Sequence, residues 1–297
     1  MYYNKQAKTD GGDTVEGLWI FYVLLYALMK GSRDGMKKAA LQKNSANEIL
    51  FFYTLFGLLL ILPFSGSAFS LAPVYIFWAF VKAGVVCLSW IFSFTALKKM
   101  SVSLFGIVDL SRILFATVLG ILVLGEAFTL PKGIGLLLVL TGLVLVNLRK
   151  TGEQRETAVW TLAFALLSCF FNAVSEMMDK ILMRHMDSSQ LQFWFMLFMT
   201  LIYGAVLLIR RERISIKSIK NNYWIGLMAI TLIVGDRLLF EANASPASEV
   251  TVMAAIKQSA VLVTVLTGYF FFGEKQLAYK LFCTGIILSG IFIAVYL

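Results

Sequence analysis

Apolar stretches separated by short polar connections follow one another from about residue 17 to residue 297. A helix that crosses a hydrocarbon core of about 30 Å needs roughly 20 mostly apolar residues. Because a segment in lipid must satisfy its own backbone hydrogen bonds, each stretch is predicted to be a membrane-spanning helix. The ten predicted spans are residues 17–37, 47–64, 74–97, 103–124, 130–148, 158–182, 190–209, 223–244, 250–272 and 278–297.

One segment of this pattern occurs twice. When the sequence is shifted by 148 positions, residues 92–126 align with residues 240–274 without a gap. Identical residues in the two copies include Ser111/Ser259, Gly120/Gly268, Gly125/Gly273 and Glu126/Glu274. A long self-similarity at one offset is the mark of a duplicated unit.

The duplication divides the chain into two halves of five spans. We expect a polar N-terminal tail at residues 1–16, a first repeat at 17–148, a linker at 149–157 and a second repeat at 158–297. Because five is an odd number, the second repeat enters the membrane from the opposite side. The predicted fold is therefore an all-α membrane protein with ten transmembrane helices in two inverted five-helix repeats, an arrangement that many secondary transporters use.

Composition agrees with a lipid environment. Hydrophobic residues make up 59% of the 297 residues and charged residues 14%, whereas soluble domains carry about 25% charged residues. The net charge of +9 comes mostly from basic residues in the short connections, where they set membrane topology. We therefore expect a lipid bilayer, and no nucleic acid, as the partner of this chain.

The basic residues of the connections also bear on sidedness. Most of them lie on the face opposite the two termini. Since basic connections stay on the cytoplasmic side, this distribution favours both termini outside. The polar tail lacks the basic-then-apolar pattern of a cleavable signal peptide, so the first span is expected to direct insertion.

Ionisable residues inside the spans are the strongest functional signal. Such charges are costly in lipid and usually face an internal cavity. They are Lys82, Asp109, Arg112, Asp236, Arg237, Glu241 and Lys257. Asp109 and Arg112 have i,i+3 spacing, and Arg237 and Glu241 have i,i+4 spacing. For these two pairs two roles remain open: a functional one, or an ion pair that only stabilises helix packing. Lys82 and Lys257 have no acidic partner on their own helix.

The depth of these residues points to a substrate site. Lys82 and Arg112 lie roughly 12–14 Å into a core about 30 Å thick, where transporter sites are expected. Asp109 and Lys257 occupy the same repeat position and are expected to share a cavity rather than a salt bridge. We predict that Lys82, Arg112, Lys257 and Arg237 bind an anionic or zwitterionic small molecule, since arginine can hold a carboxylate or phosphate with two hydrogen bonds.

The first and sixth spans both turn polar towards their ends. The first continues as Lys30-Gly31-Ser32-Arg33-Asp34, and the sixth carries Asn172, Glu176, Asp179 and Lys180. Interrupted helices at matching places in two halves indicate a transport path; the alternative is an amphipathic end that reaches the interface. Arg33 and Lys180 are candidate pathway residues, and Asp109, Glu176 and Asp236 are candidate carriers of a coupling proton.

These features resemble the drug/metabolite transporter superfamily, and most closely its EamA-type permeases. The resemblance rests on Leu124-Gly125-Glu126 and Phe272-Gly273-Glu274, each followed by a glycine-spaced helix, and on Lys37 and Lys180 late in the first and sixth spans. It implies a carrier with a central cavity lined by spans 1, 3, 4, 6, 8 and 9. Two features depart from the family: Ser111 and Ser259 stand near its usual prolines, and its members usually keep both termini in the cytoplasm.

Other functions were weighed against a carrier. No P-loop is present, and the lone His185 and the cysteines Cys87, Cys169 and Cys283 have no metal-ligand spacing. We therefore expect no enzyme activity, no cofactor and no metal. The alternatives are a drug exporter, a flippase for a lipid-linked anionic sugar and, last, a non-transporting membrane sensor. A monomer and a homodimer both fit, and a multi-pass protein of the bacterial cytoplasmic (inner) membrane is expected.

Overall fold

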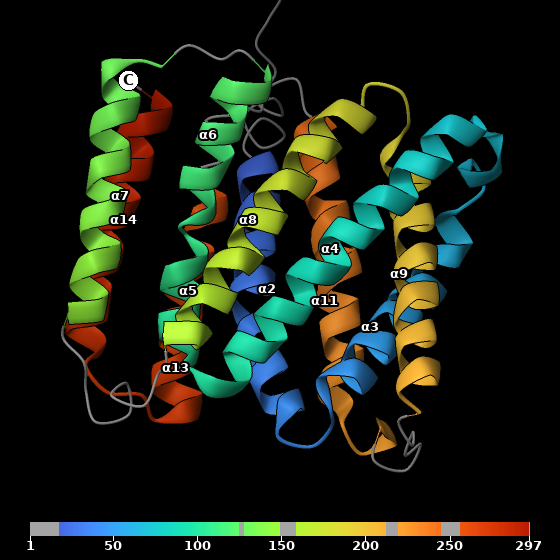
Figure 1. Ribbon diagram of the computed structural model, residues 1–297, viewed down its shortest axis with the longest axis horizontal. Coiled ribbons are helices and arrows are strands. Elements are labelled where there is room, and N and C mark those ends of the chain that lie inside the picture. The colour runs from blue at the N-terminus through green and yellow to red at the C-terminus, as the bar shows by residue number, and fades with distance from the viewer. Residues whose placement is uncertain (1–17, 125–127, 149–158, 212–218, 245–255, 297) are drawn as a thin grey trace, which may run out of the picture.

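The computed structural model describes residues 18–124, 128–148, 159–211, 219–244 and 256–296, and these form helices without any strand. Each of the ten predicted spans contains a helix (Figure 1). The helices are α2 (Leu18–Leu41), α3 (Ala46–Ile61), α4 (Pro73–Lys99), α5 (Val102–Asp109), α6 (Arg112–Leu124), α7 (Leu130–Leu148), α8 (Val159–Leu182), α9 (Ser188–Arg210), α11 (Tyr223–Ala244), α13 (Ala260–Phe272) and α14 (Leu277–Tyr296), with two 3-10 turns, η1 (Leu62–Phe64) and η2 (Ala68–Ser70). The prediction of an all-α fold is confirmed.

Most of these helices suit a bilayer by length and composition. Six of the described segments are long and apolar enough to cross it, and two shorter apolar helices cover Leu130–Val146 and Ile256–Phe272. The remaining two, α2 and α11, have 24 and 22 residues but carry several charges. Large apolar side chains such as Phe270 and Phe271, 71% and 76% exposed, cover the outside. The chain is an integral, multi-pass membrane protein.

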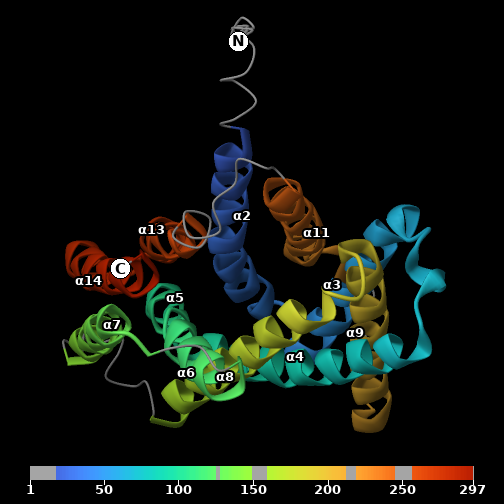
Figure 2. The same ribbon diagram turned by 90° about the horizontal axis from the view of Figure 1, so that it is seen from above.

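The first helix of each half packs against helices of the other half. α2 packs against α11 and α13 of the second half, while α8, which has the matching place in that half, packs against α4 and α6 of the first. In the same way, α4 packs against α9, and α11, which has the place of α4 in the second half, packs against α3. Figure 2 shows α2, α11, α4 and α8 around the middle of the molecule, and the α7–α14 pair at one end.

Glycines bring α7 and α14 into close contact. A Cβ atom added at Gly135 would collide with the carbonyl oxygen of Gly290, and one added at Gly290 would lie 2.6 Å from the carbonyl oxygen of Gly135. Gly142 packs in the same way against Cys283 and Ile287. Because later residues of α7 meet earlier residues of α14, the two helices are antiparallel. Small residues at such contacts let helices approach in lipid, where no hydrophobic force joins them.

Two helices break at the repeated serine although neither contains a proline there. α5 ends at Asp109 and α6 begins at Arg112, with short-range hydrogen bonds from Ser111 N to Val108 O (2.9 Å) and from Leu114 N to Ser111 O (2.9 Å). The equivalent Ser259 repeats both bonds, to Ile256 O at 3.1 Å and from Leu262 N at 2.9 Å. The helices therefore break at both positions without the proline that the family usually has there.

Glu274 joins the two halves at one face of the molecule. Its carboxylate accepts hydrogen bonds from the backbone N–H groups of Val102 (2.5 Å) and Ser103 (3.1 Å), at the start of α5, and pairs with Lys280 Nζ at 2.8 Å. Glu274 therefore caps a helix of the other half, and through Lys280 it also contacts α14, the helix that follows it. Its repeat mate Glu126 lies outside the described residues.

Further hydrogen bonds join helices at the same face. Lys38, near the end of α2, donates to the carbonyl oxygens of Leu97 (2.6 Å) and Met100 (2.8 Å) at the end of α4. Asn222, just before α11, donates to Ala40 O (3.0 Å) and Asn44 Oδ1 (2.8 Å). A cation suits the carbonyl-rich end of a helix, so these bonds hold α2, α4 and α11 together at this end.

Candidate functional site

Two adjoining cavities lie between the halves. The outer cavity, of about 410 Å³, is lined by Tyr26, Lys82, Glu176, Asp179, Met183, Ser188, Leu191, Gln192, Phe195, Asp236, Leu239 and Lys257. The inner cavity, of about 180 Å³, is lined by Tyr26, Lys30, Arg33, Asp34, Lys37, Tyr53, Trp90, Ser93, Phe105, Asp109, Arg112, Asn172, Leu232 and Asp236. Tyr26 and Asp236 belong to both, so the cavities meet there. Pockets of roughly 300–1,000 Å³ are typical of small-molecule sites.

The inner cavity owes much of its charge to one face of α2. Lys30, Arg33, Asp34 and Lys37 recur at i, i+3, i+4 and i+7, so they lie along one side of the helix. Gly31 lies close to α13, where an added Cβ would collide with Ala260 and Val263. The close approach of α13 therefore fixes the rotation of α2 and keeps its charged side on the cavity. These residues line the cavity, and their role in a transport path stays a prediction.

Arg112 connects the broken helix to α8. Its guanidinium lies 3.2 Å from the carboxylate of Asp109 and 3.3 Å from that of Glu176. The break at Ser111 brings both Asp109 and Arg112 to the wall of the inner cavity. The i,i+3 pair that the sequence allowed is present, and a carboxylate of the sixth span, which the spacing did not indicate, joins it.

Lys82 has a carboxylate partner on another helix. Its Nζ lies 3.1 Å from Asp179 on α8 and 4.1 Å from the ring centre of Phe195 on α9. The lysine is 6% exposed, whereas the Asp179 side chain is 36% exposed. The sequence showed no partner for Lys82 within α4, and the partner comes from the crossing of α4 with α8. A cation on an aromatic face adds attraction as well.

Asp236 and Arg237 are neighbours in sequence but face different surroundings. Asp236 lies where the cavities meet and accepts a hydrogen bond of 3.5 Å from Gln192. Arg237 lines neither cavity; it donates to Ser189 Oγ at 3.1 Å and lies over the ring of Phe64. Glu241 is exposed, and within the described residues Arg237 forms no ion pair with it. The i,i+4 pair is therefore absent from this conformation.

The remaining predicted residues have different positions along the path. Lys257 lines the outer cavity and Asp109 the inner one, so these two residues do not share one cavity as the sequence predicted. Lys180 belongs to α8, and its side chain lies outside the described residues. Arg33 lies in the inner cavity and is 7% exposed. Lys37 pairs with Asp34 at 2.8 Å.

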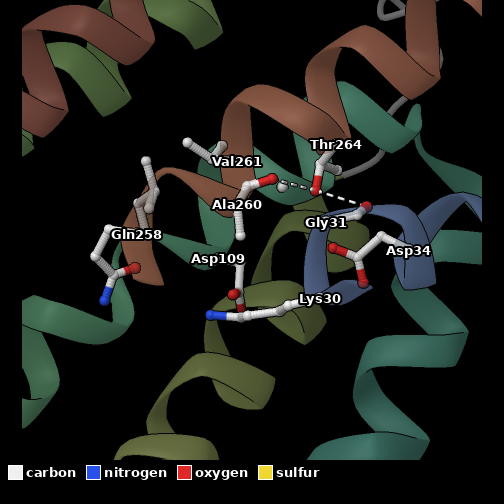
Figure 3. A pocket seen from close by; sticks show the side chains of 10 residues that line it. Lys30, Gly31, Asp34, Asp109, Gln258, Ala260, Val261 and Thr264 are labelled. Atoms are coloured by element: carbon white, nitrogen blue, oxygen red, sulfur yellow. Dashed lines mark hydrogen bonds between the residues drawn. The ribbon is translucent and has the colours of Figure 1, made fainter. Parts of the chain in front are cut away.

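A narrow space lies beside the inner cavity, between α2, α5 and the start of α13. Figure 3 shows Lys30, Asp34, Asp109 and Gln258 around it, and Thr264 donating to the carbonyl oxygens of Gly31 (3.0 Å) and Ala260 (3.2 Å). These bonds join α2 to α13 next to the site. The sequence-based set omitted Gln258, although it directly follows Lys257, because the amide carries no charge.

Several other cavity residues were missed by the sequence-based set. Tyr53, Trp90 and Phe105 line the inner cavity, but in an apolar span an aromatic residue is usually a packing residue. The Tyr53 and Trp90 rings stack at 5.1 Å. Lys30 carried a usable signal, since it shares the helical spacing of Arg33 and Lys37. Within the described residues, no group of His, Cys, Asp and Glu side chains has the arrangement of a metal site.

Comparison with known proteins agrees with this architecture. The model of the EamA-like transporter family matches residues 17–148 and again residues 159–296. The chain belongs to this family. It is accordingly a membrane transporter, in line with the resemblance inferred from its Gly-Glu motifs.

A solved crystal structure shares the fold, with a TM-score of 0.58 at 14% sequence identity, over 96% of this chain and 98% of that one. At this identity the likeness concerns the fold alone. No curated protein matches the sequence. The family therefore gives the general activity of this transporter, and the choice of solute must be argued from the cavities.

Proposed function

We propose that this EamA-family protein is a secondary transporter that moves a small polar metabolite, anionic or zwitterionic, through the two cavities by alternating access. The observation that carries the proposal is the charge of the joined cavities. Six cationic side chains line them, Lys30, Arg33, Lys37, Lys82, Arg112 and Lys257, against five carboxylates, Asp34, Asp109, Glu176, Asp179 and Asp236. An excess of positive charge in a low-dielectric site favours a solute that brings a negative charge.

The proposed mechanism rests on an inverted repeat, with repeats at 17–148 and 158–297 joined by the linker 149–157. Two packing patterns support it. α2 packs against α11 while α8, which has the matching place in the second half, packs against α4, and α7 packs antiparallel to α14. Two similar halves around one path can interchange their conformations and so expose the site to either side in turn. In this conformation the bonds of Lys38, Asn222 and Glu274 close one face.

In this proposal the cations differ in role. Lys82 and Lys257 attract the anion into the outer cavity, and Arg112 holds α6 to α8 through Glu176. Arg237, which the sequence suggested as a substrate ligand, lines neither cavity in this conformation. Its guanidinium Nε and Nη2 are buried without a hydrogen-bond partner in the described structure, so it has donors to offer once the helices move.

Asp236 is the best-placed carrier of a coupling proton. Asp109 and Glu176 both lie within salt-bridge distance of Arg112, so protonating either one would weaken an ion pair. Asp236 accepts a hydrogen bond from Gln192 and forms no ion pair with another described residue. It also lies at the junction of the cavities, where a proton and a solute would both pass.

Ligand-dependent thermal stabilisation of the purified protein tests the proposal. A solute that binds the native state raises its apparent stability by mass action. The panel consists of amino acids, organic acids, phosphorylated sugars and nucleotide sugars. An anion or zwitterion should stabilise the wild type and the Lys220→Ala control, in which an exposed lysine outside the cavities is lost. It should stabilise Lys82→Ala less, because the attraction of Lys82 for the anion in the outer cavity is lost. Stabilisation by hydrophobic cations or lipids alone would favour a drug exporter or a flippase instead.

A further inference from the structure

Two cations of the inner cavity have no carboxylate partner within the part of the chain that the structure describes. Arg112 pairs with Asp109 and Glu176, and Lys37 pairs with Asp34. By contrast, neither Lys30 nor Arg33 forms an ion pair with another described residue. Arg33 is 7% exposed, and its Nε has no hydrogen-bond partner among the described residues.

These two unpaired cations lie on the same part of the wall. Lys30 and Arg33 are three residues apart on α2, so their side chains leave the helix on the same side. Figure 3 shows Lys30 directed to the space beside Asp109. Asp236 also lines the cavity, and the two joined cavities together hold six cations against five carboxylates. One positive charge is therefore not offset, and a buried charge without a partner is unfavourable.

We propose that Lys30 and Arg33 form the subsite that binds the anionic group of the transported solute, a carboxylate or a phosphate. This inference rests on the proposed transport function and specifies its site. The planar guanidinium of Arg33 presents several donors in a fixed geometry that fits two oxygens of either group, and Lys30 adds a mobile point charge. Trp90 and Phe105 supply the apolar part of the same wall.

The assignment moves the anion contact away from the residues that the sequence indicated first. For Arg112 to bind a solute, it would have to give up one of two existing carboxylate partners, and Lys82 would have to leave Asp179. Breaking a buried pair leaves an uncompensated charge and is strongly unfavourable. An anion at Lys30 and Arg33 breaks no pair and supplies the missing counter-charge.

Binding of two simple anions to the purified full chain in detergent tests the subsite. Thermal shift is measured with acetate and, separately, with inorganic phosphate, which distinguishes a carboxylate from a phosphate site. At least one of them should stabilise the wild type. Lys30→Gln and Arg33→Gln should each weaken that apparent affinity by about tenfold or more, because a charge-assisted hydrogen bond is lost, and Arg33→Lys should restore part of it.

The matched control is Lys220→Gln, which removes an exposed positive charge that lines neither cavity. It should bind the anion as the wild type does. The subsite is refuted if Arg33→Gln binds as the wild type does, if the control loses affinity to the same extent, or if neither anion stabilises the wild type. Transport itself is judged separately by the wider solute panel, so each proposal can fail while the other stands.

Discussion

Glu274 connects the two halves of the chain at the face where α5 begins. It is 6% exposed, accepts from two backbone N–H groups of α5 and pairs with Lys280, which is 5% exposed. A carboxylate at the start of a helix compensates both the free N–H groups and the helix dipole. One side chain thus stabilises a contact between α13, α14 and α5.

Replacing Glu274 by alanine should lower stability markedly. Lys280 would then be a buried charge without its partner, a change that typically costs about 3–5 kcal/mol. The measurement is thermal unfolding of the purified protein in detergent. The double variant Glu274→Ala with Lys280→Met should recover part of the loss, because the uncompensated charge is gone. Equal loss in the single and double variants would contradict this account of the pair.

Asp236→Asn should separate proton coupling from solute movement. The amide cannot take up the proton, so a pH gradient should no longer drive uptake into proteoliposomes, while exchange of solute across the membrane continues. Glu241→Gln, which removes an exposed carboxylate of the same helix, is the control and should keep gradient-driven uptake. Gradient-driven uptake by Asp236→Asn at the wild-type rate would exclude Asp236 as the coupling residue.

At the residue scale, the sequence predicted the positions of the charged residues within the spans more fully than it predicted their contacts. The Asp109–Arg112 pair follows from helical spacing and is present. The Lys82–Asp179 pair depends on where α4 crosses α8, and a single sequence contains no direct information on that crossing. The repeated Gly-Glu pairs Gly125-Glu126 and Gly273-Glu274 marked an important position, but the helix that Glu274 caps lies in the other half.

At the scale of helices, small residues decide which pairs approach closely. Gly290 faces the backbone of α7, whereas Gly285, on the same helix α14, has nothing within contact distance of an added Cβ. The helix break at Ser111 and Ser259 is likewise local, and it occurs without proline at both repeat positions. The sequence predicted the two positions as equivalent but not the break, because serine alone does not end a helix.

Gly290→Ala should loosen the α7–α14 contact. The new Cβ would lie 2.6 Å from the carbonyl oxygen of Gly135, and overpacking of this kind typically costs about 1–3 kcal/mol. The unfolding temperature should fall in Gly290→Ala and stay constant or rise slightly in Gly285→Ala, which favours the helix and meets no neighbour. If both variants lose the same stability, the contact is not as close as the geometry indicates.

At the scale of the whole molecule, the described helices of the two halves enclose two adjoining charged cavities. The sequence sufficed for the all-α class and for the EamA relationship, since both depend on apolar length and on repeated motifs. It did not predict the two-part cavity, because the volume depends on how α2, α4, α8 and α11 cross. It also did not distinguish paired from unpaired cations, which requires the contacts themselves.

The most direct test of the central claim is solute exchange in proteoliposomes that contain the purified protein. Vesicles preloaded with each unlabelled solute of the panel are given the labelled form, and protein-free vesicles serve as the blank. At least one anionic or zwitterionic solute should exchange with saturable kinetics, and Ser93→Trp should abolish this exchange by filling the inner cavity that Ser93 lines. Exchange that Ser93→Trp leaves unchanged, or exchange of none of these solutes, would contradict transport through this cavity.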